Sequence, residues 1–320
     1  MNKNLKLLKD FESSIKQYSR NHNITKVIVA LSGGADSVGS ALALKNIGIE
    51  ILALHCNFHL RGEESNRDMA FVKEFCAQNN IPLEIKEFDV EQYRSDLVGV
   101  SVEMACRDLR HQWFQKKLEE TGYQRIVTGH NADDNIETFF LNLLRGCGSR
   151  GLKGMTVDNG KIWRPLLRFH RPNILEYLKQ YNQNFVLDST NLENDFRRNY
   201  LRNVIIPLLK KEWKGFDTAL DKTISNIEIE NRIVEDVVSL ALPLPLEPLS
   251  VAKITESSAP LLLLKRYIEP AGPFINTHEE ILSAIKANKP HIRRWQLKKG
   301  IVILRNGNLF IEMSHGEART

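Results

Sequence analysis

The segment SGGADS at residues 32–37 is the strongest constraint on this chain, because it joins an apolar run to a helical pattern. The run before it, KVIVAL at 26–31, has the β-branched composition of a strand buried on both faces, and residues 37–46 after it read as a helix. In a strand–loop–helix turn of this kind, the backbone N–H groups and the positive end of the helix dipole converge on one point. The sequence therefore predicts an anion site on this loop.

The glycines and polar side chains of this loop indicate that the anion is a phosphate group. Gly33 and Gly34 let the backbone approach a phosphate closely and allow positive φ angles. A simple tight turn would need these glycines, but it would need neither the two serine hydroxyls nor the acid. The loop lacks the lysine of GxxxxGK[ST] and the spacing of GxGxxG, so neither a Walker loop nor a dinucleotide fingerprint fits. We expect a nucleotide to bind the whole loop, which consists of Ser32, Gly33, Gly34, Ala35, Asp36 and Ser37.

Asp36 and a second group of acids predict bound cations. A carboxylate beside phosphates is repulsive unless a cation bridges them, so Asp36 predicts Mg²⁺. In the motif TGHNADDNIET, Asp133 and Asp134 lie one helical turn before Glu137, so their carboxylates repel one another. No lysine or arginine nearby on that helix relieves this repulsion. We therefore expect a metal ion or a substrate ammonium group there. An acid-rich first turn that suits the helix dipole is the alternative. His130, beside these acids, is either functional or a hydrogen-bonded structural residue.

Strand-like and helical patterns alternate from residue 26 to residue 145. This alternation predicts an α/β domain with a doubly wound, mostly parallel sheet and helices on both faces. Ligands of such sheets bind beyond the carboxyl ends of the strands, where the loops after Leu31 and Thr128 lie. The predicted strands are 26–31, 49–55, 82–90 and 125–128, and the predicted helices are 37–46, 65–80, 101–120 and 131–145.

The composition changes beyond this region and indicates a second, smaller α+β domain. LALPLPLEPLS at 240–250 reads as a linker, and Asn306-Gly307 is a strong hairpin signal between two strand-like runs. We expect a catalytic domain at residues 1–213, and a helical linker with the small domain at 214–320. The helices predicted here lie near 173–180, 200–213, 217–239, 259–267 and 278–287, and Trp113, Trp163 and Trp213 are expected in the core.

Charge, cysteine usage and hydropathy narrow the class of protein. The net charge is +5, and the segment from Leu144 to Arg171 carries seven basic residues against one acid, Asp158. This clustering favours an RNA partner, although solvated surface charge is the alternative for any single member. The four cysteines form no CxxC pair, which fits reduced thiols in the cytoplasm. The start MNKNLKLLKD has no apolar leader region and no stretch approaches the ~18 apolar residues of a membrane helix, so we expect a cytoplasmic protein without a membrane partner.

Several motifs together resemble one enzyme family. SGGADS is similar to the SGGxDS signature of the PP-loop ATP pyrophosphatases, which adenylate a carbonyl oxygen and release pyrophosphate. The combined motifs resemble the tRNA(Ile)-lysidine synthetases over about residues 26 to 213, and the region from 270 to 312 is loosely similar to that family's first C-terminal domain. Larger members carry a further domain. In chain order, the motifs are HCNFHLRGEES, ACRDLRHQWF, TGHNADDNIET, LLRGCGSRGLKGM, RPLL and DSTNLENDFRRNYLRNVIIPLL.

The resemblance implies an adenine-nucleotide-hydrolase-like fold and a specific reaction. ATP would adenylate the C2 carbonyl oxygen of the wobble cytidine in the CAU anticodon of tRNA(Ile), and L-lysine would then attack C2 and expel AMP. The small C-terminal domain, the basic segment and Arg197, Arg198 and Arg202 would bind the tRNA. A homodimer is compatible with this function. The expected roles are Asp36 and Asp133 as metal ligands, Arg110 near the nucleotide or adenylated base, His130, Asp134 and Glu137 around lysine or a metal, and Arg202 near the cytidine.

The sequence departs from the family pattern at a few positions and leaves other functions open. Asn131 stands where members commonly have a second histidine, His111 where they have tyrosine, and NFHLR replaces NHGLR around His59. The alternatives are a PP-loop tRNA thiolase, which would need sulfur-handling cysteines, and a small-molecule amide ligase, which would not need the basic segment. A nucleotide-gated RNA-binding module without turnover is a third.

Overall fold

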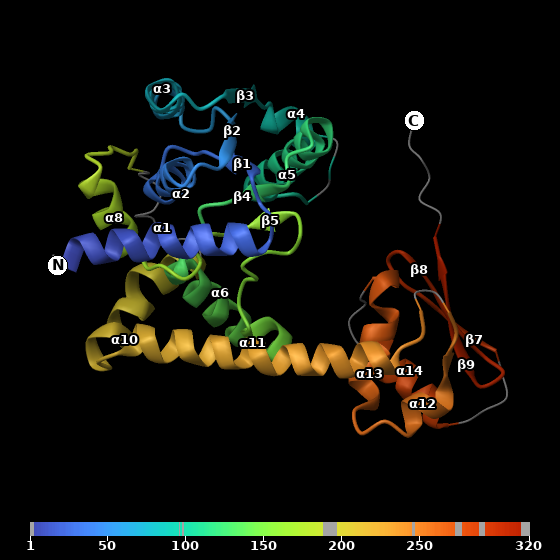
Figure 1. Ribbon diagram of the computed structural model, residues 1–320. Coiled ribbons are helices and arrows are strands. Elements are labelled where there is room, and N and C mark those ends of the chain that lie inside the picture. Colours follow the sequence, from blue (N-terminus) through green and yellow to red (C-terminus); the bar gives the residue numbers. More distant parts are fainter. Residues whose placement is uncertain are drawn as a thin grey trace. The chain divides into compact units, whose positions relative to one another are not determined.

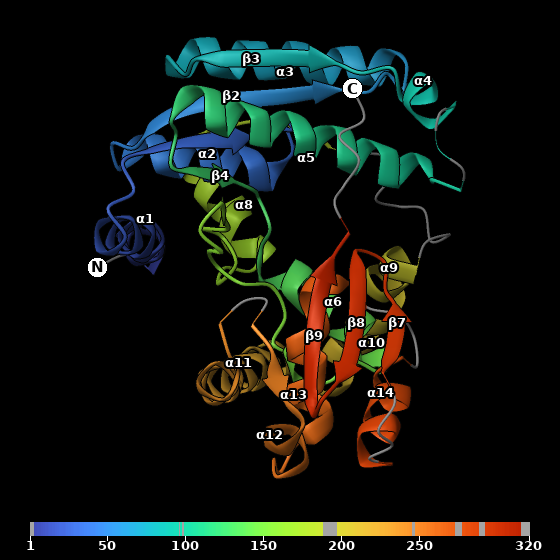
Figure 2. The same cartoon turned by 90° about the vertical axis from the view of Figure 1, so that its right-hand side faces the viewer.

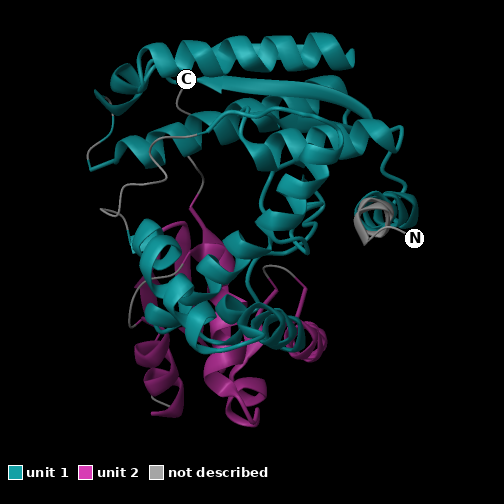
Figure 3. Cartoon of the chain, turned by 90° about the vertical axis from the view of Figure 1, so that its left-hand side faces the viewer, with its two compact units in different colours: residues 1–227 teal, residues 228–320 magenta. Residues whose placement is uncertain are grey.

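The computed structural model describes residues 3–95, 97, 99–187, 197–244, 247–272, 277–287 and 292–314. The chain forms two compact units, Met1–Ile227 and Glu228–Thr320, each of which is described by itself (Figure 3). The boundary between them lies within helix α11 (Phe216–Ala241). Among the described residues, no helix has both the length and the apolar character needed to cross a bilayer.

A five-stranded parallel sheet forms the centre of the first unit (Figures 1 and 2). The strand order is β3-β2-β1-β4-β5, and every neighbouring pair is parallel. The order reverses next to β1, since the chain first builds outward to β3 and then returns to place β4 on the other side of β1. This confirms the doubly wound sheet predicted from the sequence. The strands are β1 (Lys26–Ala30), β2 (Glu50–Asn57), β3 (Leu83–Glu87), β4 (Arg125–Val127) and β5 (Ile162–Trp163).

Alternating side chains of β1 divide the core of this unit between the two faces of the sheet. Val27 and Val29 pack with the buried faces of α1, α2, α3 and α8, whereas Ile28 packs with Trp113 and Phe114 of α5 on the other face. This two-residue period is what a strand buried on both sides requires. The helices are α1 (Lys3–Asn21), α2 (Ala35–Asn46), α3 (Glu63–Asn79), α4 (Val90–Ser95), α5 (Val102–Thr121) and α8 (Arg171–Gln180).

The helices predicted at 101–120, 131–145 and 173–180 are confirmed, and the residues at their first turns explain where they begin. The Ser101 hydroxyl accepts a hydrogen bond from the Met104 N–H at the start of α5. Asn131 caps α6 (Ala132–Leu144) in a capping box, in which its side chain accepts from the Asp134 N–H and the Asp134 carboxylate accepts from the Asn131 N–H. Pro172 lies in the first turn of α8, where its missing N–H has no partner to lose. The basic segment after α6 contains the short helix α7 (Ser149–Leu152).

The helical run predicted at 200–213 is confirmed and is wider than an α-helix at one turn. It consists of α9 (Arg197–Tyr200), the π-helical turn η2 (Leu201–Ile205) and α10 (Ile206–Glu212). Pro207 explains this turn, because its ring would collide with the carbonyl four residues earlier in a regular helix. Leu201 and Ile206 pack against Ile136 of α6, so the run lies against that helix.

The second unit is a small α+β structure with an antiparallel sheet of order β6-β9-β8-β7. Its predicted hairpin is confirmed, since Asn306 and Gly307 have φ angles of +49° and +71° between β8 and β9. One prediction about the core of the first unit is wrong. Trp113 and Trp163 are buried as predicted, but Trp213 is 61% exposed. The elements are β6 (Leu249–Ser250), α12 (Val251–Thr255), α13 (Pro260–Ile268), η3 (Glu269–Ala271), α14 (Thr277–Lys286), β7 (Arg293–Gln296), β8 (Gly300–Arg305) and β9 (Asn308–Met313).

The two glycines of the SGGADS loop should respond differently to alanine. Gly33 has a φ of +93°, and a Cβ atom there would lie 3.3 Å from the Val186 side chain, whereas Gly34 has a φ of −70° and would meet only the Ser32 hydroxyl at 3.6 Å. We expect Gly33→Ala to lower the free energy of unfolding by about 1–2 kcal/mol. Gly34→Ala should leave it unchanged or raise it by up to about 1 kcal/mol. Urea unfolding of both variants checks this, and equal losses would contradict the assigned backbone conformation.

Candidate functional site

The candidate site lies where the loops after β1 and β4 meet, at the carboxyl ends of two neighbouring strands. The β1 loop carries SGGADS into α2, and the β4 loop carries TGHN into α6. Gly129 brings these loops together, since a Cβ atom at this position would lie only 2.9 Å from the carbonyl carbon of Asp36 and from the Ser37 nitrogen. The predicted juxtaposition of the two motifs is therefore present, at the point where doubly wound sheets bind their ligands.

Internal hydrogen bonds hold the SGGADS loop in one conformation. The Ser37 hydroxyl donates to the Gly34 carbonyl at 2.9 Å and accepts from the Ser32 N–H at 3.2 Å. The Gly33 carbonyl accepts from the Val186 N–H at 2.9 Å, which ties the loop to the chain beyond α8. The N–H groups of the first turn of α2 have no acceptor within the helix. The loop thus presents a preformed set of donors of the kind that binds phosphate groups.

Asp36 is positioned as a ligand for a cation. Its Oδ2 accepts from Arg171 Nη1 at 2.7 Å, while its Oδ1 is buried and accepts no hydrogen bond from the described residues. Burial raises the pKa of Asp36, and the charge of Arg171 opposes this rise. A buried carboxylate oxygen without a hydrogen-bond partner is unusual in proteins, and a bound ion is one explanation. Since hard oxygen atoms are the ligands of Mg²⁺, the residues present fit the predicted metal at the phosphate loop.

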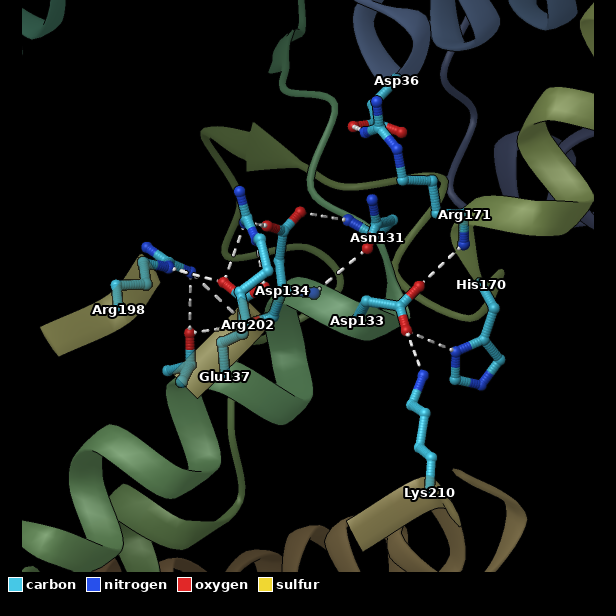
Figure 4. A network of polar contacts seen from close by, with 11 residues as sticks. Asp36, Asn131, Asp133, Asp134, Glu137, His170, Arg171, Arg198, Arg202 and Lys210 are labelled. Carbon is cyan, nitrogen blue, oxygen red and sulfur yellow. Dashed lines mark hydrogen bonds and ion pairs between the residues drawn. The ribbon is translucent and has the colours of Figure 1, made fainter. Parts of the chain in front are cut away.

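The acid pair on α6 is bonded to two arginines. Glu137, which is 2% exposed, accepts from Arg198 Nε at 2.8 Å and from Arg202 Nε at 2.6 Å, and Asp134 Oδ1 accepts from Arg202 Nη2 at 3.1 Å (Figure 4). The sequence predicts a metal ion or a substrate ammonium group at this helix face, and in the structure two arginines from another part of the chain lie there. Sequence reasoning had assigned Arg198 to tRNA phosphates. The two arginines are four residues apart, so a helical face aims both at one carboxylate.

His130 lies in strongly positive surroundings. Its Nδ1 is 2.8 Å from the Thr128 hydroxyl. Burial, followed by the nearby positive charges, lowers the pKa of His130 to about 4, so the imidazole is neutral at physiological pH. Arg110 also lies over the Phe58 ring, 5.5 Å from its centroid. The basic residues that contribute to the lowered pKa are Arg164, Arg198, Arg107 and Arg110. Their combined charge suits a polyanionic ligand such as a nucleotide or an RNA backbone.

Asp133 has a different set of partners from the acid pair on α6. Its carboxylate accepts from the Arg171 N–H at 2.8 Å and from Lys210 Nζ at 3.1 Å, and it lies 3.3 Å from His170 Nδ1 (Figure 4). Burial alone would raise the pKa of Asp133, but these donors lower it overall. Asp133, His170 and Asp217 are residue types that can hold a metal ion, and their nearest ligand atoms lie within 4.8 Å of one another. In this structure Lys210 bridges the carboxylates of Asp133 and Asp217. The contacts of Asp133 among the described residues do not include Asp36.

Part of one predicted motif cannot be placed. Residues 188–196, which open the motif DSTNLENDFRRNYLRNVIIPLL, lie outside the described residues. His170 was missed by the sequence analysis, and no local pattern pointed to it. Arg171 was counted there only as one member of the basic segment.

Comparisons with known proteins agree with this geometry. The profile of the PP-loop domain family matches residues 7–209. A tRNA(Ile)-lysidine synthase of Bacteroides thetaiotaomicron is 41% identical over 251 residues, which cover 77% of this chain and 58% of that protein. A tRNA(Ile)-lysidine synthase of Parabacteroides distasonis is 45% identical over 185 residues, which cover 58% of this chain and 42% of the relative. The chain thus spans about half the length of the curated relatives it matches.

A solved structure shares the fold. The U34-tRNA thiolase NcsA from Methanococcus maripaludis, determined with its 4Fe-4S cluster, is similar with a TM-score of 0.55 and 18% sequence identity. The similarity covers 69% of this chain and 79% of the thiolase. At this level of identity, the likeness concerns the fold alone.

His170 should stabilise the site in a pH-dependent way. Hydrogen bonds to Asp133 and Asp221 raise its pKa from 6.5 to about 10. The stabilisation is therefore complete below pH 6.5 and is lost as the pH rises toward about 10. We expect His170→Gln to lower the free energy of unfolding most below pH 6.5, and the difference from the parent protein to shrink across this window.

Denaturant unfolding at a series of pH values measures this difference. The same substitution at His278 provides a control of opposite sign. Burial lowers the pKa of His278, so its protonation opposes folding at low pH, and its removal should not lower the free energy of unfolding there. A His170→Gln effect that does not change with pH would show that the imidazole is held neutral.

Proposed function

The chain belongs to the PP-loop domain family, and from this membership we propose that it joins L-lysine to the wobble cytidine of a CAU anticodon in tRNA(Ile) at the expense of ATP. The curated relatives named tRNA(Ile)-lysidine synthase, 41% and 45% identical over the matched residues, support this substrate choice. The observation that carries the proposal is the contact at Gly129. This contact brings the SGGADS loop beside the helix that carries Asp134 and the buried Glu137, and it supports a nucleotide and a cationic substrate at one site.

The first step would transfer AMP to the base. The C2 carbonyl oxygen of cytidine attacks the α-phosphorus of ATP, a new P–O bond forms, and pyrophosphate leaves. The N–H groups at the start of α2 and the 32–37 loop would bind the triphosphate. Asp36 would hold Mg²⁺ through its unpartnered Oδ1, and the ion would neutralise phosphate charge. Arg110 and the neutral His130 would lie near the reacting base, which must leave its stack to enter the site.

The second step would use the acid pair and its arginines to orient lysine. The lysine ε-amine attacks C2, the C2–O bond breaks, and AMP departs while the amine loses protons. Free lysine carries both an α-ammonium and an α-carboxylate group. The site offers the complement of each, since Asp134 and Glu137 can accept from an ammonium and the adjacent Arg198 and Arg202 can donate to a carboxylate. Substrate binding would then share or replace ion pairs that already exist within the protein.

The basic segment would supply affinity for tRNA without reading its sequence. Arg145, Lys161 and Arg168 are exposed between α6 and α8, and Arg197 is exposed at the start of α9. Phosphate contacts of this kind position a nucleic acid and make binding sensitive to salt. We place the reaction in the cytoplasm, where tRNA is modified.

The cysteines do not favour a thiolase despite the shared fold. Burial raises the pKa of the Cys56 thiol to about 12 and that of Cys76 to about 11, so both are protonated at physiological pH. Protonated thiols are poor metal ligands and poor nucleophiles. The acid pair of α6, by contrast, matches a cationic amino acid.

The proposed reaction can be tested directly. We expect label from lysine to enter transcripts of tRNA(Ile) that carry CAU, in the presence of ATP and Mg²⁺, and not to enter matched transcripts with a UAU or GAU anticodon. Asp36→Asn keeps the shape of the side chain but removes its charge, so it should abolish incorporation. Incorporation into all three transcripts, or full activity of Asp36→Asn, would contradict the proposal.

The acid pair should act on lysine rather than on ATP. Asp134→Asn retains an oxygen that can accept from the Asn131 N–H, so the α6 cap can persist while the negative charge is lost. Loss of one charge-assisted hydrogen bond should raise the KM for lysine by roughly tenfold to a hundredfold. The KM for ATP, measured in the same variant, should change little. An equal rise in both values would place Asp134 at the nucleotide.

A further inference from the structure

Arg171 lies at the phosphate loop rather than on the open surface expected for the basic segment. Its Nη1 donates to Asp36 Oδ2 at 2.7 Å, although the two residues come from different helices. The Arg171 side chain is 44% exposed and the Asp36 side chain 22% exposed, so the guanidinium covers the loop from the solvent side. It is therefore a positive charge placed where the triphosphate of ATP would enter.

The backbone of Arg171 is fixed while its tip is comparatively free. Its N–H donates to Asp133 Oδ2 at 2.8 Å, at the first position of α8. His170, directly before it, is held between Asp133 and Asp221 at 3.3 Å and 2.9 Å, and Pro172 follows. These contacts anchor the start of α8 against α6 and α11. Among the described residues the guanidinium forms one ion pair, to Asp36, at the end of this anchored arm (Figure 4).

The Arg171–Asp36 pair competes with the role proposed for Asp36. A carboxylate that binds Mg²⁺ gives up much of its attraction for a guanidinium, because the ion neutralises it. A triphosphate brought by the same ion carries several negative charges and offers the paired oxygens that a guanidinium binds best. The anchored arm would keep the guanidinium within reach of the new charge. The balance of charge therefore favours a change of partner when the nucleotide binds.

We propose that Arg171 is a polyphosphate ligand, which neutralises Asp36 in the nucleotide-free protein and moves to the β- and γ-phosphates of ATP when the nucleotide binds. The proposal rests on the assignment of the 32–37 loop to ATP. The β- and γ-phosphates become the pyrophosphate leaving group, and negative charge grows on them as the P–O bond to the α-phosphorus breaks. A guanidinium at this position stabilises that charge. His170, Asp133 and Asp221 act as positioning residues for the arm.

The test measures nucleotide binding without lysine or tRNA. We expect Arg171→Gln to weaken binding of ATP with Mg²⁺, and of pyrophosphate, on the order of tenfold. AMP lacks the β- and γ-phosphates, so its affinity should change by less than about twofold, a size typical of a lost surface charge. Arg171→Lys keeps the charge and should lose less than the glutamine variant. Lys179→Gln removes a charge from the exposed end of the same helix and should leave all three affinities unchanged.

Three results would overturn the proposal. Tighter or equal ATP binding by Arg171→Gln would mean that the guanidinium only blocks Asp36. Equal loss of ATP and AMP by both Arg171 variants, with melting temperatures preserved, would assign Arg171 to the shape of the loop. Loss of tRNA binding with unchanged ATP binding would show that Arg171 contacts tRNA and not the polyphosphate. The binding assay needs neither lysine nor tRNA, so it tests this inference separately from the proposed function. If the parent protein made no lysidine but the variants showed the predicted pattern of ATP, pyrophosphate and AMP binding, the proposed function would be wrong and the role of Arg171 would still hold.

Discussion

The backbone contact between the β1 and β4 loops is the constraint on which the site depends. Gly129 has no room for a side chain, because a Cβ atom would lie 2.9 Å from the backbone of Asp36 and Ser37. This approach is possible only because the two strands are neighbours whose carboxyl ends meet at one edge of the sheet. Without it, the phosphate loop and the acids of α6 would face separate crevices. The strand order and one glycine thus bring the SGGADS loop and the acids of α6 into one place.

Buried charge then determines how the site is arranged. Every acid assigned to it has a basic partner from the same chain: Arg171 for Asp36, Arg198 and Arg202 for the α6 pair, and Lys210 for Asp133. Glu137 is 2% exposed and the other three acids are partly buried, and carboxylates withdrawn from water destabilise a fold unless they are paired. The proposed substrates would therefore bind by replacing these partners. A cationic or polyanionic substrate could then enter the site while each acid keeps a positive partner.

The sequence predicted those features of the fold that depend on residues close together in the chain. Four strands of the parallel sheet, the helices that begin near residues 101 and 131 and the Asn306-Gly307 turn were readable, because each depends on residues a few positions apart, whereas the two-residue strand β5 was not predicted. The partners of the acids were not readable, since Arg198 and Arg202 reach Glu137 only through the packing of α9 and η2 against α6. His170 was missed for the same reason. Trp213 was wrongly placed in the core, because an aromatic residue near a helix end carries no local sign of its exposure.

The shared fold with a tRNA thiolase separates what the fold determines from what it leaves open. The fold alone does not decide which reaction a site carries out. In the reaction proposed here, the choice of nucleophile would lie in the residues of the neighbouring loop and helix that face the activated atom. Here these are carboxylates bridged by guanidinium groups, while the thiols of Cys56 and Cys76 are held protonated by burial. The proposed substrate, an amine that also carries a carboxylate, would match both sets of charges, whereas a sulfur donor would match neither.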